Sequence, residues 1–274
     1  MSEQEPRPAG NAQTPKLRLG GMALRNGLLV HGPTHWAVAV RAVDGSVRVA
    51  SGSKPRFEGF DGVPGARGLV RLAEAFAVIP LVKRALPEVR LPFQDAGVLG
   101  VAAATATAGS LLRRRAGGAA GDAAGAALSL APALFALQGG ELAAYHGVEH
   151  KAIAAYEQDA GDAADAAKEH DRCGSNLVAP MLAANVAGAA LLRRVVASPG
   201  PVANAAVAMG AMAAAVEVFA WSERHSGTRL ARALRRPGFE LQRAMGTREP
   251  DERQLEVGRA ALVEILRVEP APVE

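Results

Sequence analysis

The chain has 274 residues and a formal net charge of +4, and 49% of its residues are hydrophobic while only 4% are aromatic. This apolar content excludes a disordered chain, and the single cysteine excludes a scaffold of internal disulfides. The basic residues occur in short clusters beside apolar stretches, and few aromatic side chains are available to stack on bases. We therefore do not expect a nucleic-acid partner. Alanine accounts for 60 residues, which fits either a soluble helical core or thin membrane helices.

The first part of the chain divides into a tail and a β-containing region. Residues 1–16 are polar and rich in Pro, Glu and Gln, and we interpret them as a disordered tail. Residues 17–92 are expected to form a small N-terminal β-containing cytoplasmic region. Alternating runs at 36–43 and 46–50 are joined by Asp44-Gly45, which predicts a β-hairpin. Helical periodicity then follows over 66–86, with an end expected around Pro80 and Pro87.

The next region, residues 93–222, contains four segments without a charged residue. They comprise 17, 18, 19 and 22 residues, at 96–112, 123–140, 174–192 and 195–216. A membrane-spanning helix needs about 20 apolar residues, with a range of about 17–25. We therefore predict a mainly α, multi-spanning membrane protein with about four Ala-rich transmembrane helices in two hairpins. A soluble Ala-rich helical bundle is the alternative.

Arginine clusters mark the tight ends of both predicted hairpins, at 113–115 and 193–194. The opposite side of the membrane carries more basic residues near the membrane ends: Lys83, Arg84, Arg90, Lys151, Lys168, Arg172, Arg224, Arg229, Arg232, Arg235 and Arg236. Because positively charged loops are retained in the cytoplasm, we expect a multi-pass protein of the cytoplasmic membrane with both termini cytoplasmic. Residues 223–274 are expected to form a C-terminal helical tail, with a basic surface helix over 228–236 and an amphipathic helix over 250–267.

The segment from Glu141 to Glu157 carries the strongest chemical signal. On a helix, His146 and His150 are four residues apart, so both imidazoles project from one face and can bind one metal ion. Glu149 lies beside them and can act as a base. This His-x-x-Glu-His order is the one found in inverted zinc-protease motifs, so the segment predicts a site for a divalent metal, most simply zinc. A surface helix with two titrating histidines has the same pattern.

Two histidines do not complete a zinc site, which needs at least a third protein ligand. One candidate is Glu217, an ionisable residue at the end of the fourth uncharged segment, where it needs a partner. The other candidates are His170 and Cys173, which are three residues apart and precede a glycine. Cys173 also fits a small buried residue at the start of a helix. The sequence leaves open which residue completes the site.

These strings resemble one known family. The run from Tyr145 to Lys151, followed by His170 and Cys173-Gly174-Ser175, is similar to the YqhQ-like family of bacterial membrane proteins, a domain of unknown function catalogued as predicted metal-dependent enzymes. Further similarity lies in an N-terminal glycine motif and a C-terminal signature: Gly20-Gly21-Met22-Ala23, Gly32-Pro33, Pro237-Gly238, Leu241-Gln242, residues 247–251 and residues 254–257. The resemblance implies a multi-spanning membrane protein and no established reaction.

This chain departs from the family pattern at three N-terminal positions. Asn26 stands where the family usually has Glu, Met22 where it has Gln, and His31 where it has Arg. The candidate metal and catalytic positions are retained. If the missing Glu belongs to the active constellation, this chain is a divergent member.

The leading functional hypothesis is a metal-dependent enzyme at the cytoplasmic membrane face, with metal-assisted hydrolysis and Glu149 as the base. Membrane lipids are the expected surroundings, and the substrate is expected to be a peptide or a lipid-linked molecule near the bilayer. The competing hypothesis is a non-catalytic membrane scaffold or interaction protein, in which the same residues form a structural metal site or a polar cluster.

Overall fold

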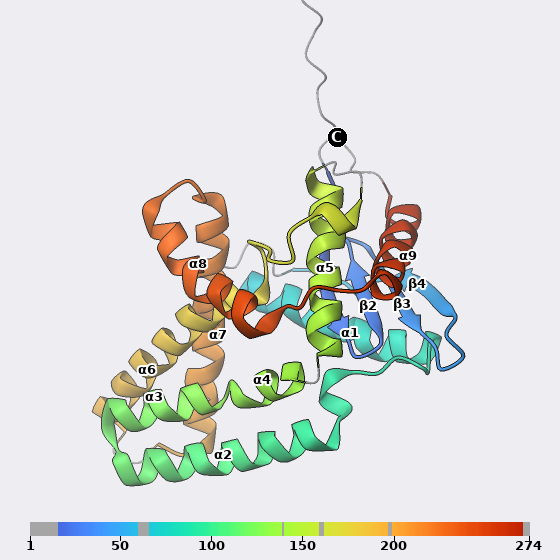
Figure 1. Ribbon diagram of the computed structural model, residues 1–274. Helices are drawn as coiled ribbons and strands as arrows, with labels where there is room; N and C mark the ends of the chain where they lie inside the picture. Colours follow the sequence, from blue (N-terminus) through green and yellow to red (C-terminus); the bar gives the residue numbers. More distant parts are fainter. Residues whose placement is uncertain (1–15, 60–65, 139, 159–161, 197–198, 271–274) are drawn as a thin grey trace, which may run out of the picture.

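A computed structural model describes residues 16–59, 66–138, 140–158, 162–196 and 199–270. Nearly all of the predicted tail at 1–16 lies outside these residues. The described chain is mainly helical, with one small antiparallel sheet near the N-terminus (Figure 1). Its four strands follow one another in the order β1-β2-β3-β4: β1 Gly20–Leu24, β2 Gly27–His31, β3 His35–Arg41 and β4 Val47–Ser53.

The predicted hairpin around Asp44-Gly45 is confirmed, since β3 and β4 pair antiparallel. The last pair is Arg41 with Val47, so the connection is longer than a two-residue turn. Gly45 has a φ of 85°, a left-handed conformation that favours glycine. The Asp44 carboxylate accepts hydrogen bonds from the backbone N–H and the hydroxyl of Ser46, which closes the loop.

The sheet is covered by helices on both faces, because alternate strand residues are apolar on opposite sides. One face packs against α1 (Ala66–Ala85), and the other packs against α5 (Glu141–Gln158) and α9 (Glu252–Val268) (Figure 1). The α1 side includes Leu29, Trp36, Val38, Val40, Val78 and Val82. The α5 and α9 side includes Leu28, Val30, Val148, Ile153, Val257, Ala261 and Ile265.

Helix α1 differs from its prediction at Pro80, which lies inside the helix and does not end it. A proline inside a helix removes one backbone hydrogen bond. Val78 and Val82, on either side of Pro80, are both fully buried against the sheet. Packing on the sheet therefore holds the helix together through the proline as far as Ala85.

The predicted membrane region forms two helical hairpins that cross at α3 and α6 (Figure 1). The first comprises α2 (Ala96–Ala116), α3 (Gly118–Leu128) and α4 (Ala131–Gln138), and the second comprises α6 (Val178–Val195) and α7 (Pro201–Arg224). The second predicted span is interrupted near Ser129, whose hydroxyl donates to the carbonyl of Ala126. Within the described residues, four helical segments are long and apolar enough to span a membrane: Ala96–Ala116, Gly118–Gln138, Gly174–Val195 and Pro201–Arg224.

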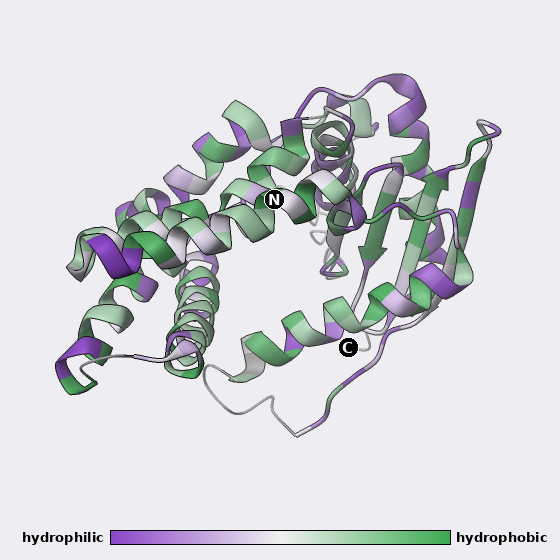
Figure 2. Cartoon of the chain, turned by 90° about the horizontal axis from the view of Figure 1, so that it is seen from below, coloured by the Kyte–Doolittle hydropathy of each residue, from purple (hydrophilic) through white to green (hydrophobic). Residues whose placement is uncertain are grey.

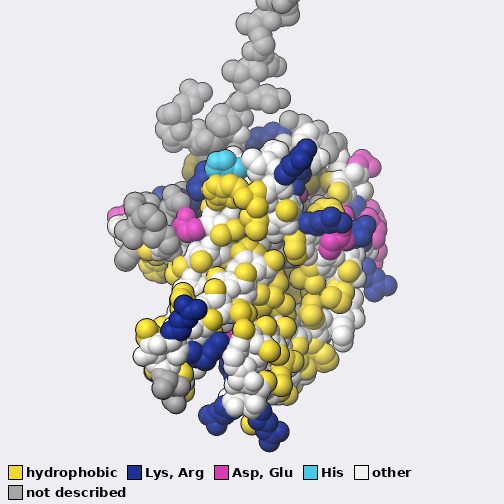
Figure 3. Space-filling view, turned by 90° about the vertical axis from the view of Figure 1, so that its left-hand side faces the viewer, with side chains coloured by type: hydrophobic (Ala, Val, Ile, Leu, Met, Phe, Trp, Pro, Cys, Tyr) yellow, Lys and Arg dark blue, Asp and Glu magenta, His cyan; other side chains and the backbone are white. Residues whose placement is uncertain are grey.

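The surfaces of these four segments are largely apolar and uncovered. At most 22% of the residues in the apolar window of each segment are buried within the chain. The hydropathy colouring is mostly white to green along the hairpins, with purple at their tips (Figure 2). Seen from the side of the tips, hydrophobic side chains cover much of the face, and Lys and Arg lie at its lower end and again on its upper part (Figure 3). This distribution fits helices in contact with lipid.

The C-terminal region returns to the sheet. Helix α8 (Arg229–Leu241) begins at Thr228, whose side chain accepts a hydrogen bond from the Ala231 N–H. A π-helical turn η4 (Gln242–Gly246) follows directly, and α9 then begins at a capping box formed by Asp251 and Gln254. Because α9 contributes to the core beside the sheet, the C-terminal helix and the N-terminal strands form one packing unit.

Candidate metal centre

Helix α5 brings the two histidines of the predicted motif together. Tyr145, Val148 and Ile153 point towards the core between α5, α9 and the sheet. His146 and His150 share a different face of α5, with their ring centroids 4.4 Å apart. His150 is 2% exposed, so its imidazole is held almost entirely within the protein.

The two rings are oriented by backbone carbonyls from distant parts of the chain. His146 Nδ1 lies 2.7 Å from the carbonyl oxygen of Gly246, and His150 Nδ1 lies 2.6 Å from that of Lys168. A carbonyl only accepts hydrogen bonds, so each Nδ1 carries the proton and donates. In its neutral form each ring therefore presents an Nε2 lone pair, the arrangement usual for metal-binding histidines.

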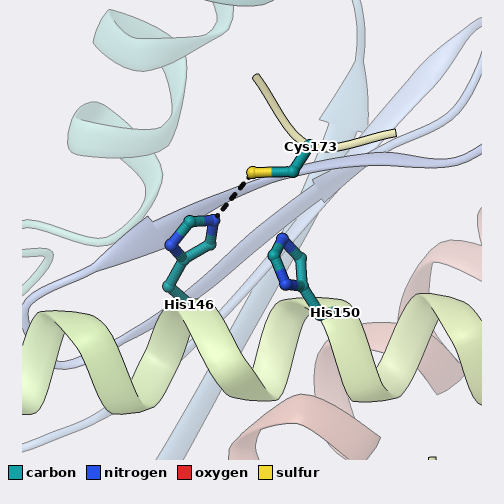
Figure 4. A group of neighbouring side chains, drawn as sticks. All are labelled: His146, His150 and Cys173. Carbon is teal, nitrogen blue, oxygen red and sulfur yellow. Dashed lines mark hydrogen bonds between the residues drawn. The ribbon is translucent and has the colours of Figure 1, made fainter. Parts of the chain in front are cut away.

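Cys173 supplies a third donor atom at the same point. Its sulfur lies 3.4 Å from His146 Nε2, and the candidate ligand atoms of His146, His150 and Cys173 lie within 4.8 Å of one another. Figure 4 shows the two imidazoles rising from neighbouring turns of α5 towards the thiol, which comes from a separate segment. This group of three residues can hold a metal ion.

Burial leaves one atom of this group without a partner. Among the described residues, His150 Nε2 is buried and makes no hydrogen bond. An unsatisfied buried polar atom costs about 1–3 kcal/mol, and a metal ion bound between the three residues would remove that cost. Two imidazole nitrogens and one thiolate are also the ligand types that zinc prefers. The residues present therefore fit a zinc ion.

The two histidines titrate in opposite directions. Burial lowers the pKa of His150 to about 3, and the neighbouring His146 adds to the effect. Burial also lowers the pKa of His146, but the hydrogen bond to Cys173 and the nearby charge of Glu149 outweigh it and raise this pKa to about 9. His150 is therefore neutral and ready to bind a metal, whereas His146 must first lose a proton.

The loop that carries Cys173 is held by Gln242. Its amide oxygen accepts from the His170 N–H, and its amide nitrogen donates to the His170 carbonyl and to the Ser175 hydroxyl. Gln242 is fully buried and begins the π-helical turn η4, whose last residue, Gly246, positions His146. One short turn therefore positions candidate ligands from two different segments.

Glu149 lies beside the group in contact with strand β1. Its carboxylate accepts a hydrogen bond from the backbone of Ala23. A Cβ atom at Gly21 would lie 2.6 Å from Glu149 Cγ, so only glycine leaves room for this side chain. Burial raises the pKa of Glu149, and the nearby His146 and His170 reduce the effect. Gly21 of the N-terminal glycine motif therefore leaves the space in which the side chain of the candidate base, Glu149, lies.

A cavity of about 450 Å³ opens beside these residues. His146, Glu149, His150 and Cys173 line it on one side. Ala133, Ala136 and Leu137 line it from α4, the end of a membrane-type helix. The candidate metal group therefore faces a pocket of the size of small-molecule sites, and that pocket reaches the apolar region of the molecule.

Comparison with known proteins gives a match to one family. Residues 141–268 match the model of a family described as "Protein of unknown function (DUF1385)". The resemblance to an uncharacterised family is confirmed, and the matched segment contains His146, Glu149, His150, Cys173 and Gln242. No curated protein and no solved structure matches the chain.

The remaining candidate ligands lie differently. His170 lines the cavity with its ring centroid 5.7 Å from that of His150. Its Nε2 is paired with Glu157, and its Nδ1 accepts from the Arg172 N–H, so both ring nitrogens are engaged. Glu217 lies on α7 and, within the described chain, is neither in the group of three nor in the cavity lining.

Two positioning residues carry no metal-ligand signal in the sequence. Gln242 appears there only as part of the C-terminal signature. Lys151 follows the motif directly, is 4% exposed, and donates to the carbonyls of Ala164 and Ala166. It thereby holds the segment that leads to Lys168, the hydrogen-bond partner of His150. Its place directly after the histidine motif is the sequence feature that could point to this role.

Proposed function

We propose that the protein is a metal-dependent hydrolase at the cytoplasmic face of the membrane, with zinc held by His146, His150 and Cys173. The observation that carries the proposal is the buried, unpartnered Nε2 of His150 beside a second imidazole and a thiol. Three protein ligands leave room for a fourth position, as in catalytic zinc sites. The adjoining cavity supports a catalytic over a purely structural site.

A zinc ion held there would polarise a water molecule or a substrate carbonyl as a Lewis acid. Glu149 accepts the proton of the attacking water and returns it to the leaving group as the bond to that group breaks. Burial raises the pKa of Glu149, which suits a carboxyl that first takes up and then releases a proton. The Ala23 hydrogen bond and the space at Gly21 keep the carboxylate facing the cavity.

The cavity lining supports a substrate from the membrane region. Ala133, Ala136 and Leu137 lie at the end of an apolar helix, so a membrane-associated peptide or a lipid-linked molecule can reach the site along it. The basic residues near the membrane ends support a cytoplasmic location for both termini and for this site.

The test uses the full chain in proteoliposomes, a library of fluorogenic membrane-associated peptides and lipid-linked esters, and metal analysis by mass spectrometry. We expect one zinc per chain and zinc-dependent turnover in the wild type. Glu149→Gln should retain zinc and lose turnover by about 100-fold or more, the range for a general base. His146→Ala should lose both.

The same experiment tests the scaffold alternative. Zinc in the wild type with no turnover difference between wild type and Glu149→Gln would assign the metal a structural role. Wild-type protein without stoichiometric metal would overturn the proposal altogether.

A further inference from the structure

A second cavity lies in the hairpin region, away from the candidate metal centre. Its volume is about 590 Å³, and it is enclosed by residues of α1, α2, α3, α6 and α7. It shares no lining residue with the cavity beside His146. Figure 2 shows that the helices of this region are predominantly hydrophobic in colour. This second cavity is therefore a separate candidate binding site within the membrane-type part of the molecule.

The apolar part of its lining suits a hydrocarbon chain. Large flexible or aromatic side chains face it from three helices: Leu72, Phe76, Met181, Leu182, Met209 and Met212. Phe76 is 50% exposed and Met209 is 58% exposed, so packing within the chain covers only part of these two side chains. Methionine adapts its shape to an irregular apolar ligand, and a methylene chain is such a ligand.

The charged part of the lining has an excess of positive charge. Asp122 is buried and forms an ion pair with Arg193 of the other hairpin, so this pair is neutral. Arg113 also lines the cavity, and its guanidinium crosses over Gly125, where any Cβ atom would collide with it. Within the described residues, Arg113 has no carboxylate partner. The cavity therefore offers one uncompensated guanidinium.

A polar amide adds to this end of the lining. Asn185 lies in the middle of α6, within the uncharged run 174–192, and faces the cavity. Its side chain makes no hydrogen bond within the part of the chain that the structure describes. Polar groups inside membrane helices usually have a partner or a function. Arg113 and Asn185 can both donate to the oxygens of a phosphate group.

We propose that this cavity binds one molecule of an anionic phospholipid. The Arg113 guanidinium pairs with the lipid phosphate, and an acyl chain lies among the Leu, Phe and Met side chains of α1, α6 and α7. The position of Arg113 at the tip end of α2, with Arg114 and Arg115 beyond it, matches the level of a lipid headgroup, while the apolar lining matches the level of its chains. The bound lipid ties the two hairpins to α1.

The test measures lipid affinity of the full, delipidated chain in detergent by native mass spectrometry. The two probes are phosphatidylglycerol and phosphatidylcholine with identical acyl chains. We expect the wild type to bind one phosphatidylglycerol roughly tenfold more tightly than phosphatidylcholine, because the choline ammonium of phosphatidylcholine offsets the negative charge that Arg113 attracts. Arg113→Gln should remove this preference. The matched control is Arg114→Gln, a neighbouring arginine outside the cavity lining, which should keep it.

A second variant tests the cavity itself. Ala189→Trp fills the space from α6 and should abolish tight binding of both lipids, while size-exclusion chromatography confirms that the variant is folded. Equal wild-type affinity for the two lipids would overturn the proposal. So would retention of the preference in Arg113→Gln, or tight binding by folded Ala189→Trp.

Discussion

At the scale of single residues, the two site histidines are held in one orientation by main-chain acceptors. Gly246 and Lys168 accept the Nδ1 protons, so neither ring can turn away without breaking a buried hydrogen bond. The buried Nε2 of His150 makes no hydrogen bond, which costs free energy in the folded chain. The proposed zinc ion would satisfy this atom, so zinc binding should be coupled to stability.

Substitution of Gln242 tests whether this residue positions the loop that carries Cys173. Gln242→Leu keeps the volume but removes three hydrogen bonds to the loop that carries Cys173. We expect zinc affinity to fall by roughly 10- to 100-fold, the usual effect of losing a group that orients a metal ligand. A competition titration with a zinc chelator measures it. The control is the exposed neighbour Arg243→Ala, and equal affinity in the two variants would contradict this role.

His31 gives a pH dependence outside the metal group. Burial, followed by the nearby charge of Lys54, lowers its pKa from 6.5 to about 4. The unfolded chain then binds more protons than the folded chain between these values, so stability is fully present above pH 6.5 and is lost as the pH falls towards 4. The loss is at most about 3 kcal/mol. Thermal unfolding between pH 7 and pH 4 should show a shallower decline in His31→Gln, and an unchanged decline would contradict the assignment.

At the scale of elements, α5 packs so closely against its neighbours that glycine is required at two contact points, one on α5 itself and one on α9. A Cβ atom at Gly147 would lie 2.3 Å from the Arg248 carbonyl oxygen, and one at Gly258 of α9 would lie 2.3 Å from Val148 Cγ1. These contacts bring the helix that carries the motif against the segment that follows η4. The close packing of α5 therefore contributes directly to the geometry of the site.

The crossing of α5 and α9 can be tested with one type of substitution at two places. Gly258→Ala should destabilise the protein by about 1–3 kcal/mol, because the added methyl group overpacks the interface. Gly210→Ala in α7 places the same methyl group in open space and should be neutral or stabilising by up to about 1 kcal/mol through helix propensity. Thermal unfolding in detergent compares them. A Gly258→Ala variant as stable as Gly210→Ala would contradict the close crossing.

Elements whose signal is local were predictable, and those set by tertiary packing were not. The β3-β4 hairpin and the four apolar segments follow from alternation and from uncharged length. The passage of α1 through Pro80 depends on Val78 and Val82 packing on the sheet, which no local pattern contains. The histidine pair follows from helical spacing. The sequence leaves the third ligand open among Glu217, His170 and Cys173. The contact between Cys173 and His146 depends on a loop held by Gln242, which no local pattern contains.

At the scale of the whole molecule, a buried ion pair joins the two hairpins. Asp122 of α3 is 6% exposed and pairs with Arg193 at the end of α6. In the sequence both residues marked the ends of uncharged segments, and nothing there showed that they meet. The pair fixes where the hairpins cross, since removing one partner leaves a buried charge without compensation.

Arg193→Ala should therefore destabilise the protein by about 2–3 kcal/mol, less than for a fully buried pair because Arg193 is partly exposed. Arg194→Ala, which removes the adjacent arginine, should change stability by no more than about 0.5 kcal/mol. Thermal unfolding of both variants in the same detergent measures the difference. Equal effects would show that the hairpins are held together without this pair.

The proposed zinc-binding role of His146, His150 and Cys173 is tested most directly by X-ray absorption spectroscopy at the zinc edge on the purified full chain. We expect one zinc per chain with nitrogen neighbours at about 2.0–2.1 Å and one sulfur neighbour at about 2.3 Å. The sulfur signal should disappear in Cys173→Ser. Wild-type protein without stoichiometric zinc, or with only nitrogen and oxygen neighbours, would contradict the assignment of these three residues as the metal centre.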